Sequence, residues 1–136
     1  MSFRLREHTA DVAVEASAAD VSGAFAAAAD GLAAAHCEEI PGTGRRFSLA
    51  VDAESPEALL FDYLDELIYQ RDVRGVLPVE NEATVTETDD GWRIEASARG
   101  VPLSDVAARE VKAPTYSQMR VEPTDDGWSV YVVLDV

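Results

Sequence analysis

The pentapeptide TDDGW occurs twice in this chain, at residues 88–92 and again at residues 124–128. Each copy places Asp-Gly between two runs of alternating apolar and polar residues, a pattern that predicts a β-hairpin with a tight turn. No wider similarity joins the two regions, so we interpret the repeat as the same turn chemistry used twice. The second half of the chain is therefore predicted to be antiparallel β-structure.

The strands that follow the two turns differ in character. After the first turn, one face of the predicted strand is apolar and the other polar, the apolar positions being Trp92, Ile94, Ala96 and Ala98. After the second turn, residues 130–134 are apolar at almost every position, which is typical of a strand inside a sheet. Asp135 interrupts that apolar run directly before Val136.

The first half of the chain carries two helical patterns. Asp20 is a suitable N-cap for residues 21–35, in which apolar side chains recur at intervals of three and four. Ser55, Pro56 and Glu57 supply a cap, a proline at the first helical position and an early acid. The second helix is predicted to bury one face, made of Leu60, Tyr63, Leu64, Leu67 and Ile68.

Three shorter segments of the first half, at 3–6, 12–16 and 46–51, are predicted to be strands, with a turn at 7–11. A chain of 136 residues buries roughly two-thirds of its unfolded surface, and no linker divides it. We therefore expect one compact domain, 1–136, of the α+β class, with two helices packed on one face of a largely antiparallel β-sheet.

The charge of the chain is strongly negative. It has 26 acidic and 11 basic residues, a net charge of −15, and Lys112 as its only lysine. Such a surface suits molar intracellular salt, in which the Debye length falls to about 3 Å, and a halophilic origin is our hypothesis. Because the same surface repels phosphate backbones, direct sequence-specific binding of nucleic acid is not expected.

Other classes of protein are disfavoured by what the chain lacks. It has no apolar run of the roughly 20 residues that span a membrane and no signal-like N-terminus, so a cytoplasmic location is expected. The single cysteine, Cys37, is expected to be a helix-end thiol, packed or partly exposed, with His36 as the only soft ligand nearby. Residues 40–44 are glycine-rich but lack the ending of a phosphate loop. No catalytic motif is present, and activity as an enzyme is not expected.

Three places hold polar residues that local structure does not obviously require. Asp11 lies in the run His8-Thr9-Ala10-Asp11, where it either caps a turn or serves a site. Lys112 is present by chance or because a compact cation is needed beside phosphate or carboxylate. Asp135 either points to solvent or joins another acid around a hard cation such as Ca²⁺. Spacing alone does not bring Asp11 and Asp135 together.

Four segments, at 8–11, 60–69, 111–116 and 132–136, resemble in the same order the motifs of the archease family. The resemblance covers the full length and implies a compact α+β domain that binds a divalent metal, usually assigned as calcium. Carried onto this chain, the metal ligands would be Asp11, Asp135 and a main-chain or terminal oxygen of Val136.

The same resemblance implies a function. Archeases are non-enzymatic activators that help the RtcB-type tRNA-splicing RNA ligase to become guanylylated from GTP and to turn over, and they broaden its choice of nucleotide. Lys112 and His8 would then contact the partner or a phosphate. Relatives commonly carry histidine after the Thr-Tyr pair, where this chain has Ser117. The alternative hypothesis is a chaperone-like or adaptor module that binds proteins through its sheet edge.

Overall fold

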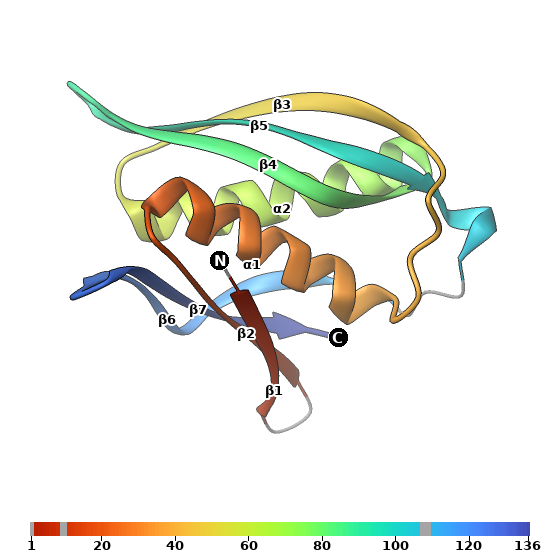
Figure 1. Ribbon diagram of the computed structural model, residues 1–136, viewed down its shortest axis with the longest axis horizontal. Helices are drawn as coiled ribbons and strands as arrows, with labels where there is room; N and C mark the ends of the chain where they lie inside the picture. The colour runs from red at the N-terminus through yellow and green to blue at the C-terminus, as the bar shows by residue number, and fades with distance from the viewer. Residues whose placement is uncertain (1, 9–10, 107–109) are drawn as a thin grey trace.

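The computed structural model describes residues 2–8, 11–106 and 110–136. Two antiparallel sheets enclose a layer of two helices (Figure 1). The elements in chain order are β1 (Ser2–His8), β2 (Asp11–Ala18), α1 (Val21–His36), β3 (Arg45–Ala53), α2 (Pro56–Arg74), β4 (Val76–Thr88), β5 (Gly91–Pro102), a short 3-10 helix (Leu103–Asp105), β6 (Ala113–Thr124) and β7 (Gly127–Asp135).

The strands divide between a four-stranded sheet, in the order β1-β2-β7-β6, and a three-stranded sheet, in the order β3-β5-β4. The α+β class and the antiparallel pairing are confirmed. The structure differs from the prediction in having two sheets, with the helices between them, where a single sheet with helices on one face was predicted. The reason lies in α1, where all side chains from Ala24 to Ala29 are buried. A helix that is apolar on nearly all sides, with small side chains, packs between two sheets.

Both helices begin at the predicted caps. The Asp20 carboxylate accepts a hydrogen bond from the Gly23 amide at 2.7 Å, and the Ser55 hydroxyl accepts one from the Ala58 amide at 3.1 Å. The predicted apolar face of α2 is fully confirmed, since Leu60, Tyr63, Leu64, Leu67 and Ile68 are all buried in the main core. Among the described residues, no helix has the length and hydropathy to cross a membrane.

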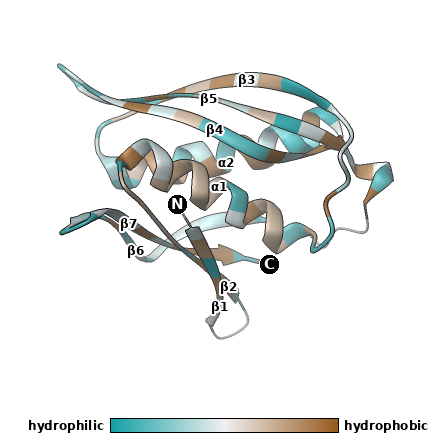
Figure 2. Cartoon of the chain, viewed as in Figure 1, coloured by the Kyte–Doolittle hydropathy of each residue, from teal (hydrophilic) through white to brown (hydrophobic). Residues whose placement is uncertain are grey.

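The two Asp-Gly turns form hairpins as predicted. Thr88 pairs with Gly91 between β4 and β5, and Thr124 pairs with Gly127 between β6 and β7. Hydrophilic residues gather at these hairpin tips, whereas α1 is largely hydrophobic (Figure 2). β7 lies inside its sheet, in agreement with its apolar sequence.

The first connection is shorter than the predicted turn at 7–11. His8 ends β1 and pairs with Asp11, the first residue of β2, so strand pairing extends into the segment that was expected to be a turn. Backbone pairing across the hairpin satisfies the amide and carbonyl groups that a wider turn would leave open. Residues 9–10, which join the two strands, lie outside the described part of the chain.

Gly127→Ala should destabilise the protein, because the Gly127 φ angle of 154° disfavours an L-residue and an added Cβ would collide with the Ala18 carbonyl oxygen. We expect a loss of about 2 kcal/mol in the free energy of unfolding, measured by urea titration in molar KCl. Gly42→Ala is the control, since a Cβ there meets nothing within 4 Å. Equal losses for the two variants would contradict the steric explanation.

Candidate functional site

Asp11 and Asp135 meet at one end of the four-stranded sheet, which we call the Asp11–Asp135 end. The antiparallel register pairs Val12 of β2 with Leu134 of β7. Continuing that register by one residue places Asp11 opposite Asp135, on the face of the sheet turned away from the helices. Asp11 is half-buried and Asp135 is exposed. The fold therefore joins two acids that lie at opposite ends of the sequence.

Lys112 reaches the same end through its backbone. Its amide donates a hydrogen bond of 2.8 Å to the Asp135 carbonyl oxygen, and the next residue, Ala113, pairs with Asp135 in the β6–β7 ladder. The Lys112 side chain is exposed. On the other side, the backbone of His8 pairs with Asp11. β1, β2 and β7 thus each bring a predicted site residue to this end of the sheet, Lys112 lies directly before β6, and Val136 follows β7.

The donor set at this end suits a hard cation. Two carboxylates and an oxygen of Val136 are the oxygen ligands that Ca²⁺ prefers. Thr115 adds a second observation, because its hydroxyl oxygen is buried and has no hydrogen-bond partner among the described residues. Thr115 pairs with Val133, so its side chain shares a face of the sheet with Asp135.

The side chains at this end are nevertheless too few to hold a metal ion by themselves. Within residues 2–8, 11–106 and 110–136, no three His, Cys, Asp or Glu side chains are placed to hold a metal ion. A cation here would need main-chain or terminal oxygen, water or a partner's oxygen to fill its coordination shell, which numbers six to eight for Ca²⁺. The alternative role for Asp11, capping the turn, involves residues 9–10 and lies outside the described residues.

Arg71 is a buried residue near this end that the sequence analysis did not identify. It is 8% exposed, and its Nη1 donates to the Val111 carbonyl oxygen and to His36 Nε2, each at 2.7 Å. Since Nε2 accepts, the proton of the His36 ring is on Nδ1, which donates to the Leu32 carbonyl at 2.9 Å. Arg71 thereby ties α1 and α2 to the residue before Lys112. In the sequence, Arg71 follows Ile68 by three residues and therefore falls on the apolar face of α2, a position that could have identified it as buried.

His36 and Cys37 are held by hydrogen bonds at the end of α1. The Cys37 side chain is buried, as expected for a packed thiol, and its Sγ donates to the Glu39 carbonyl oxygen at 3.0 Å. His36 is committed to the hydrogen bonds with Arg71 and Leu32. Both residues therefore help to end α1 and start its connector.

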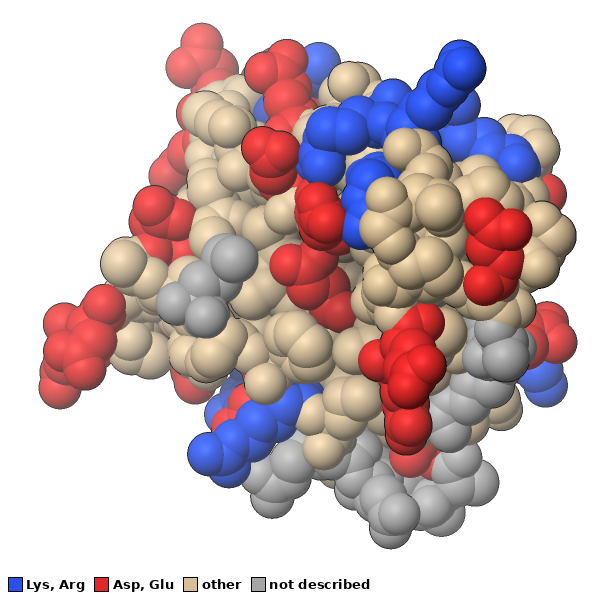
Figure 3. All heavy atoms as spheres, turned by 45° about the vertical axis from the view of Figure 1, so that its right-hand side comes forward, with Lys and Arg blue, Asp and Glu red and all other residues tan. Residues whose placement is uncertain are grey.

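A group of arginines at one end of the three-stranded sheet is the other notable charge feature. Lys and Arg side chains gather at the top of the face shown in Figure 3. In the register of β3 and β5, Arg46 pairs with Arg99, and Arg74 of α2 lies over the Phe47 ring.

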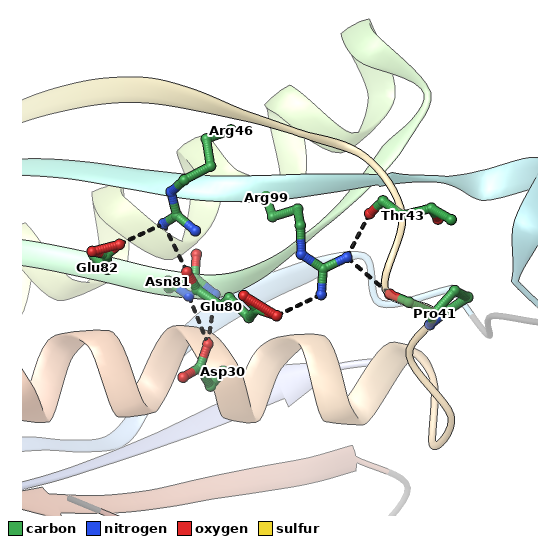
Figure 4. A network of polar contacts seen from close by, with 8 residues as sticks. All are labelled: Asp30, Pro41, Thr43, Arg46, Glu80, Asn81, Glu82 and Arg99. Atoms are coloured by element: carbon green, nitrogen blue, oxygen red, sulfur yellow. Dashed lines mark hydrogen bonds and ion pairs between the residues drawn. The ribbon is translucent and has the colours of Figure 1, made fainter.

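These arginines are engaged within the chain. Arg99 donates to the Pro41 carbonyl oxygen and to Glu80, and Arg46 donates to the Glu80 carbonyl oxygen and pairs with Glu82 (Figure 4). The hydrogen bond and the charge of Arg99 lower the pKa of the Glu80 carboxyl. Glu80 has a φ of 46° and lies where the β4–β5 register shifts. The network therefore holds a bulge and the connector after α1.

The described chain is a small α+β domain of two antiparallel sheets around two helices, with hard oxygen donors at one sheet end. The family model that matches it is that of the Archease protein family, over residues 3–136. The chain belongs to the archease family.

Individual relatives agree with this assignment. The archease of Thermococcus gammatolerans is 33% identical over 135 residues, covering 96% of this chain and 95% of the relative. The archease of Thermococcus kodakarensis is 32% identical, with the same coverage. Both alignments span nearly the whole of each protein.

Two solved structures share the fold. The solution structure of protein 1598 of Methanobacterium thermoautotrophicum has a TM-score of 0.84 and 25% identity, and the match covers 99% of each chain. The crystal structure of an archease, described as a possible chaperone, from Thermotoga maritima has a TM-score of 0.67 and 20% identity. That match covers 98% of this chain and 96% of the other and shows the fold alone.

Proposed function

We propose that this chain is a non-enzymatic protein cofactor that promotes guanylylation and multiple turnover of an RtcB-type tRNA-splicing RNA ligase and broadens its use of nucleotides. The observation that carries the proposal is the meeting of Asp11, Asp135 and Lys112 at one end of the sheet. Membership of the archease family supports it.

In this proposal Asp11, Asp135 and an oxygen of Val136 hold a divalent cation, with calcium as the expected ion. A bound cation would supply positive charge to oxygen atoms of a nucleotide or of the partner. Lys112, whose backbone amide is bonded to the Asp135 carbonyl oxygen, carries a compact ammonium group suited to a phosphate or a carboxylate. Its position is fixed because its own amide is bonded to Asp135 and the preceding carbonyl is bonded to Arg71.

Reconstitution with the cognate ligase tests the proposal. Guanylylation of the ligase from GTP and multiple-turnover ligation are measured with and without this chain, in a buffer that contains molar KCl and calcium. We expect turnover of the ligase to continue beyond one round only when the chain is present. Absence of any stimulation would overturn the proposal, and a KCl series in the same assay tests the halophilic hypothesis.

The second candidate is a chaperone-like or adaptor function, which the description of the Thermotoga maritima relative as a possible chaperone favours. A pull-down in molar KCl separates the two, because an activator should capture one dominant ligase and an adaptor a mixture of proteins. Suppression of the aggregation of an unrelated unfolded protein would favour the second candidate.

Extending the chain beyond Val136 should weaken binding of the cation. Val136 is half-buried against the core, so residues added after it would crowd the Asp11–Asp135 end and convert any terminal carboxylate into a neutral amide. We expect the calcium dissociation constant, measured by calorimetry, to rise about tenfold or more. The same tag placed before Ser2 is the control. Equal affinity in the two tagged forms would remove Val136 from the site.

A further inference from the structure

Three large side chains of α2 and β6 are exposed, Tyr69, Val73 and Tyr116; together with Phe61, which is half-buried, we call them the Tyr116 patch. Tyr69, Val73 and Tyr116 are 58%, 60% and 56% exposed. Tyr69 and Val73 are one turn apart on α2, so their side chains are neighbours along the helix. A folded domain exposes aromatic side chains at a cost in hydration, and a group of them marks a contact surface.

The two rings of the patch form a rigid, open platform. Phe61 of α2 and Tyr116 of β6 are stacked with ring centroids 4.2 Å apart and an interplanar angle of 4°. Phe61 is half-buried beneath Tyr116, whereas Tyr116 is mostly exposed. Because the stack fixes the Tyr116 ring in place, its outer face can receive a planar or cationic group with little loss of side-chain entropy.

Unpaired carboxylates flank this platform. Asp62 and Asp65 are exposed and make no hydrogen bond or ion pair with other residues in the described ranges. Asp62 is close enough to act on Tyr116, since partial burial and then the charge of Asp62 raise the pKa of the Tyr116 hydroxyl. An acidic surface adapted to salt accounts for the carboxylates, but it does not account for exposed aromatic rings beside them.

A guanidinium group fits this combination. It stacks on an aromatic face and donates in-plane hydrogen bonds to a carboxylate at the same time. Stacking and apolar contact also persist in molar salt, where a charge pair alone is screened. Tyrosine and arginine, together with tryptophan, are enriched among the residues that dominate the affinity of protein–protein interfaces.

We propose that the Tyr116 patch is a docking surface for a protein partner that places an arginine side chain between the Tyr116 ring and Asp62 and an apolar side chain against Tyr69 and Val73. The identity of that partner as the RNA ligase rests on the proposed function. β6 begins directly after Lys112, so Tyr116 lies four residues along the chain from the Lys112 amide that is bonded to Asp135.

The test measures the dissociation constant of the complex with the cognate ligase in molar KCl, by sedimentation, for the wild type, Tyr116→Ala, Tyr116→Phe and Asp62→Asn. We expect Tyr116→Ala to weaken the complex at least tenfold and Asp62→Asn about threefold, while Tyr116→Phe, which keeps the ring, stays within twofold. Ile40→Ala is the matched control, because Ile40 is 40% exposed but lies in the connector after α1.

Two readouts separate docking from folding and from the cation site. Terbium luminescence titration, which reports cation binding, should be unchanged in Tyr116→Ala and Asp62→Asn. Thermal unfolding should be unchanged in Asp62→Asn, while Tyr116→Ala, which loses the stack on Phe61, should unfold at a slightly lower temperature but remain fully folded at the assay temperature. Stimulation of guanylylation by Tyr116→Ala should recover at saturating concentration, since the variant loses affinity and keeps the Asp11–Asp135 end.

The outcomes are distinct. If the wild type stimulates the ligase and Tyr116→Ala binds it as tightly, the docking inference is wrong and the proposed function stands. If the wild type does not bind the ligase, the proposed function and the partner named here both fail. If the wild type self-associates and Tyr116→Ala does not, the patch binds a second copy of this chain. If the chain binds single-stranded RNA only when Tyr116 is present, the patch binds a nucleobase. Either result would overturn the proposal of an arginine-bearing protein partner.

Discussion

On the proposed function, Asp11→Ala and Asp135→Ala should each reduce stimulation of the RNA ligase about a hundredfold or more, because either change removes one of the two acids that the β2–β7 register brings to the same end of the sheet. A single remaining carboxylate leaves most of the coordination shell of a divalent cation to water. The calcium dissociation constant should rise by a similar factor in calorimetry.

Folding should be unaffected by these changes. Asp135 is exposed and Asp11 half-buried, so neither substitution opens a cavity in the core. The control is Glu87→Ala, which removes an exposed carboxylate from the β4–β5 hairpin of the other sheet. Unchanged stimulation by both aspartate variants would exclude the metal site from the mechanism.

Lys112 provides a check that does not depend on the cation. Its ammonium group is not a metal ligand, so Lys112→Ala should lower stimulation while the calcium dissociation constant stays the same. Together, the three variants separate binding of the cation from contact with the partner.

Arg71→Met should cost about 3 kcal/mol in the free energy of unfolding. The change leaves two buried acceptors, His36 Nε2 and the Val111 carbonyl oxygen, without the donor that now lies 2.7 Å from each. A buried acceptor that loses its partner costs about 1–3 kcal/mol. Urea titration in molar KCl measures the effect.

Arg74→Met is the matched control on the same helix. Arg74 is exposed, lies over the Phe47 ring and donates to Gln70, so its loss should cost about 1 kcal/mol or less. Similar losses in the free energy of unfolding for the two variants would show that the buried hydrogen bonds of Arg71 do not contribute to stability. Ligase stimulation by Arg71→Met should also fall at temperatures where the variant is still folded, because Val111 no longer anchors the segment that carries Lys112.

The elements with local causes could be predicted from the amino-acid sequence. Asp20 and Ser55 cap the two helices through bonds to amides three residues away, and the Asp-Gly pairs set both hairpins. The alternation of residues 92–98 fixed which face of β5 is buried. These features depend on neighbours within a few residues, so the local amino-acid sequence specifies them.

The family motifs paired Asp11 with Asp135 by resemblance, but no local pattern did so. Their meeting depends on the register between β2 and β7, which is set when Val12, Val14 and Leu134 enter one core. A shift of one residue would turn those side chains outward, so burial selects the register that brings the acids together.

Tertiary structure alone decided three further features. The division of the strands into two sheets depends on α1 being buried on both sides, which residue spacing does not show. The role of Arg71 requires α1, α2 and the segment before β6 to converge on one guanidinium. The Tyr116 patch requires β6 to lie along α2, where Tyr116 covers Phe61. In each case the contact joins segments far apart in the chain, and the packing of the whole core fixes their distance.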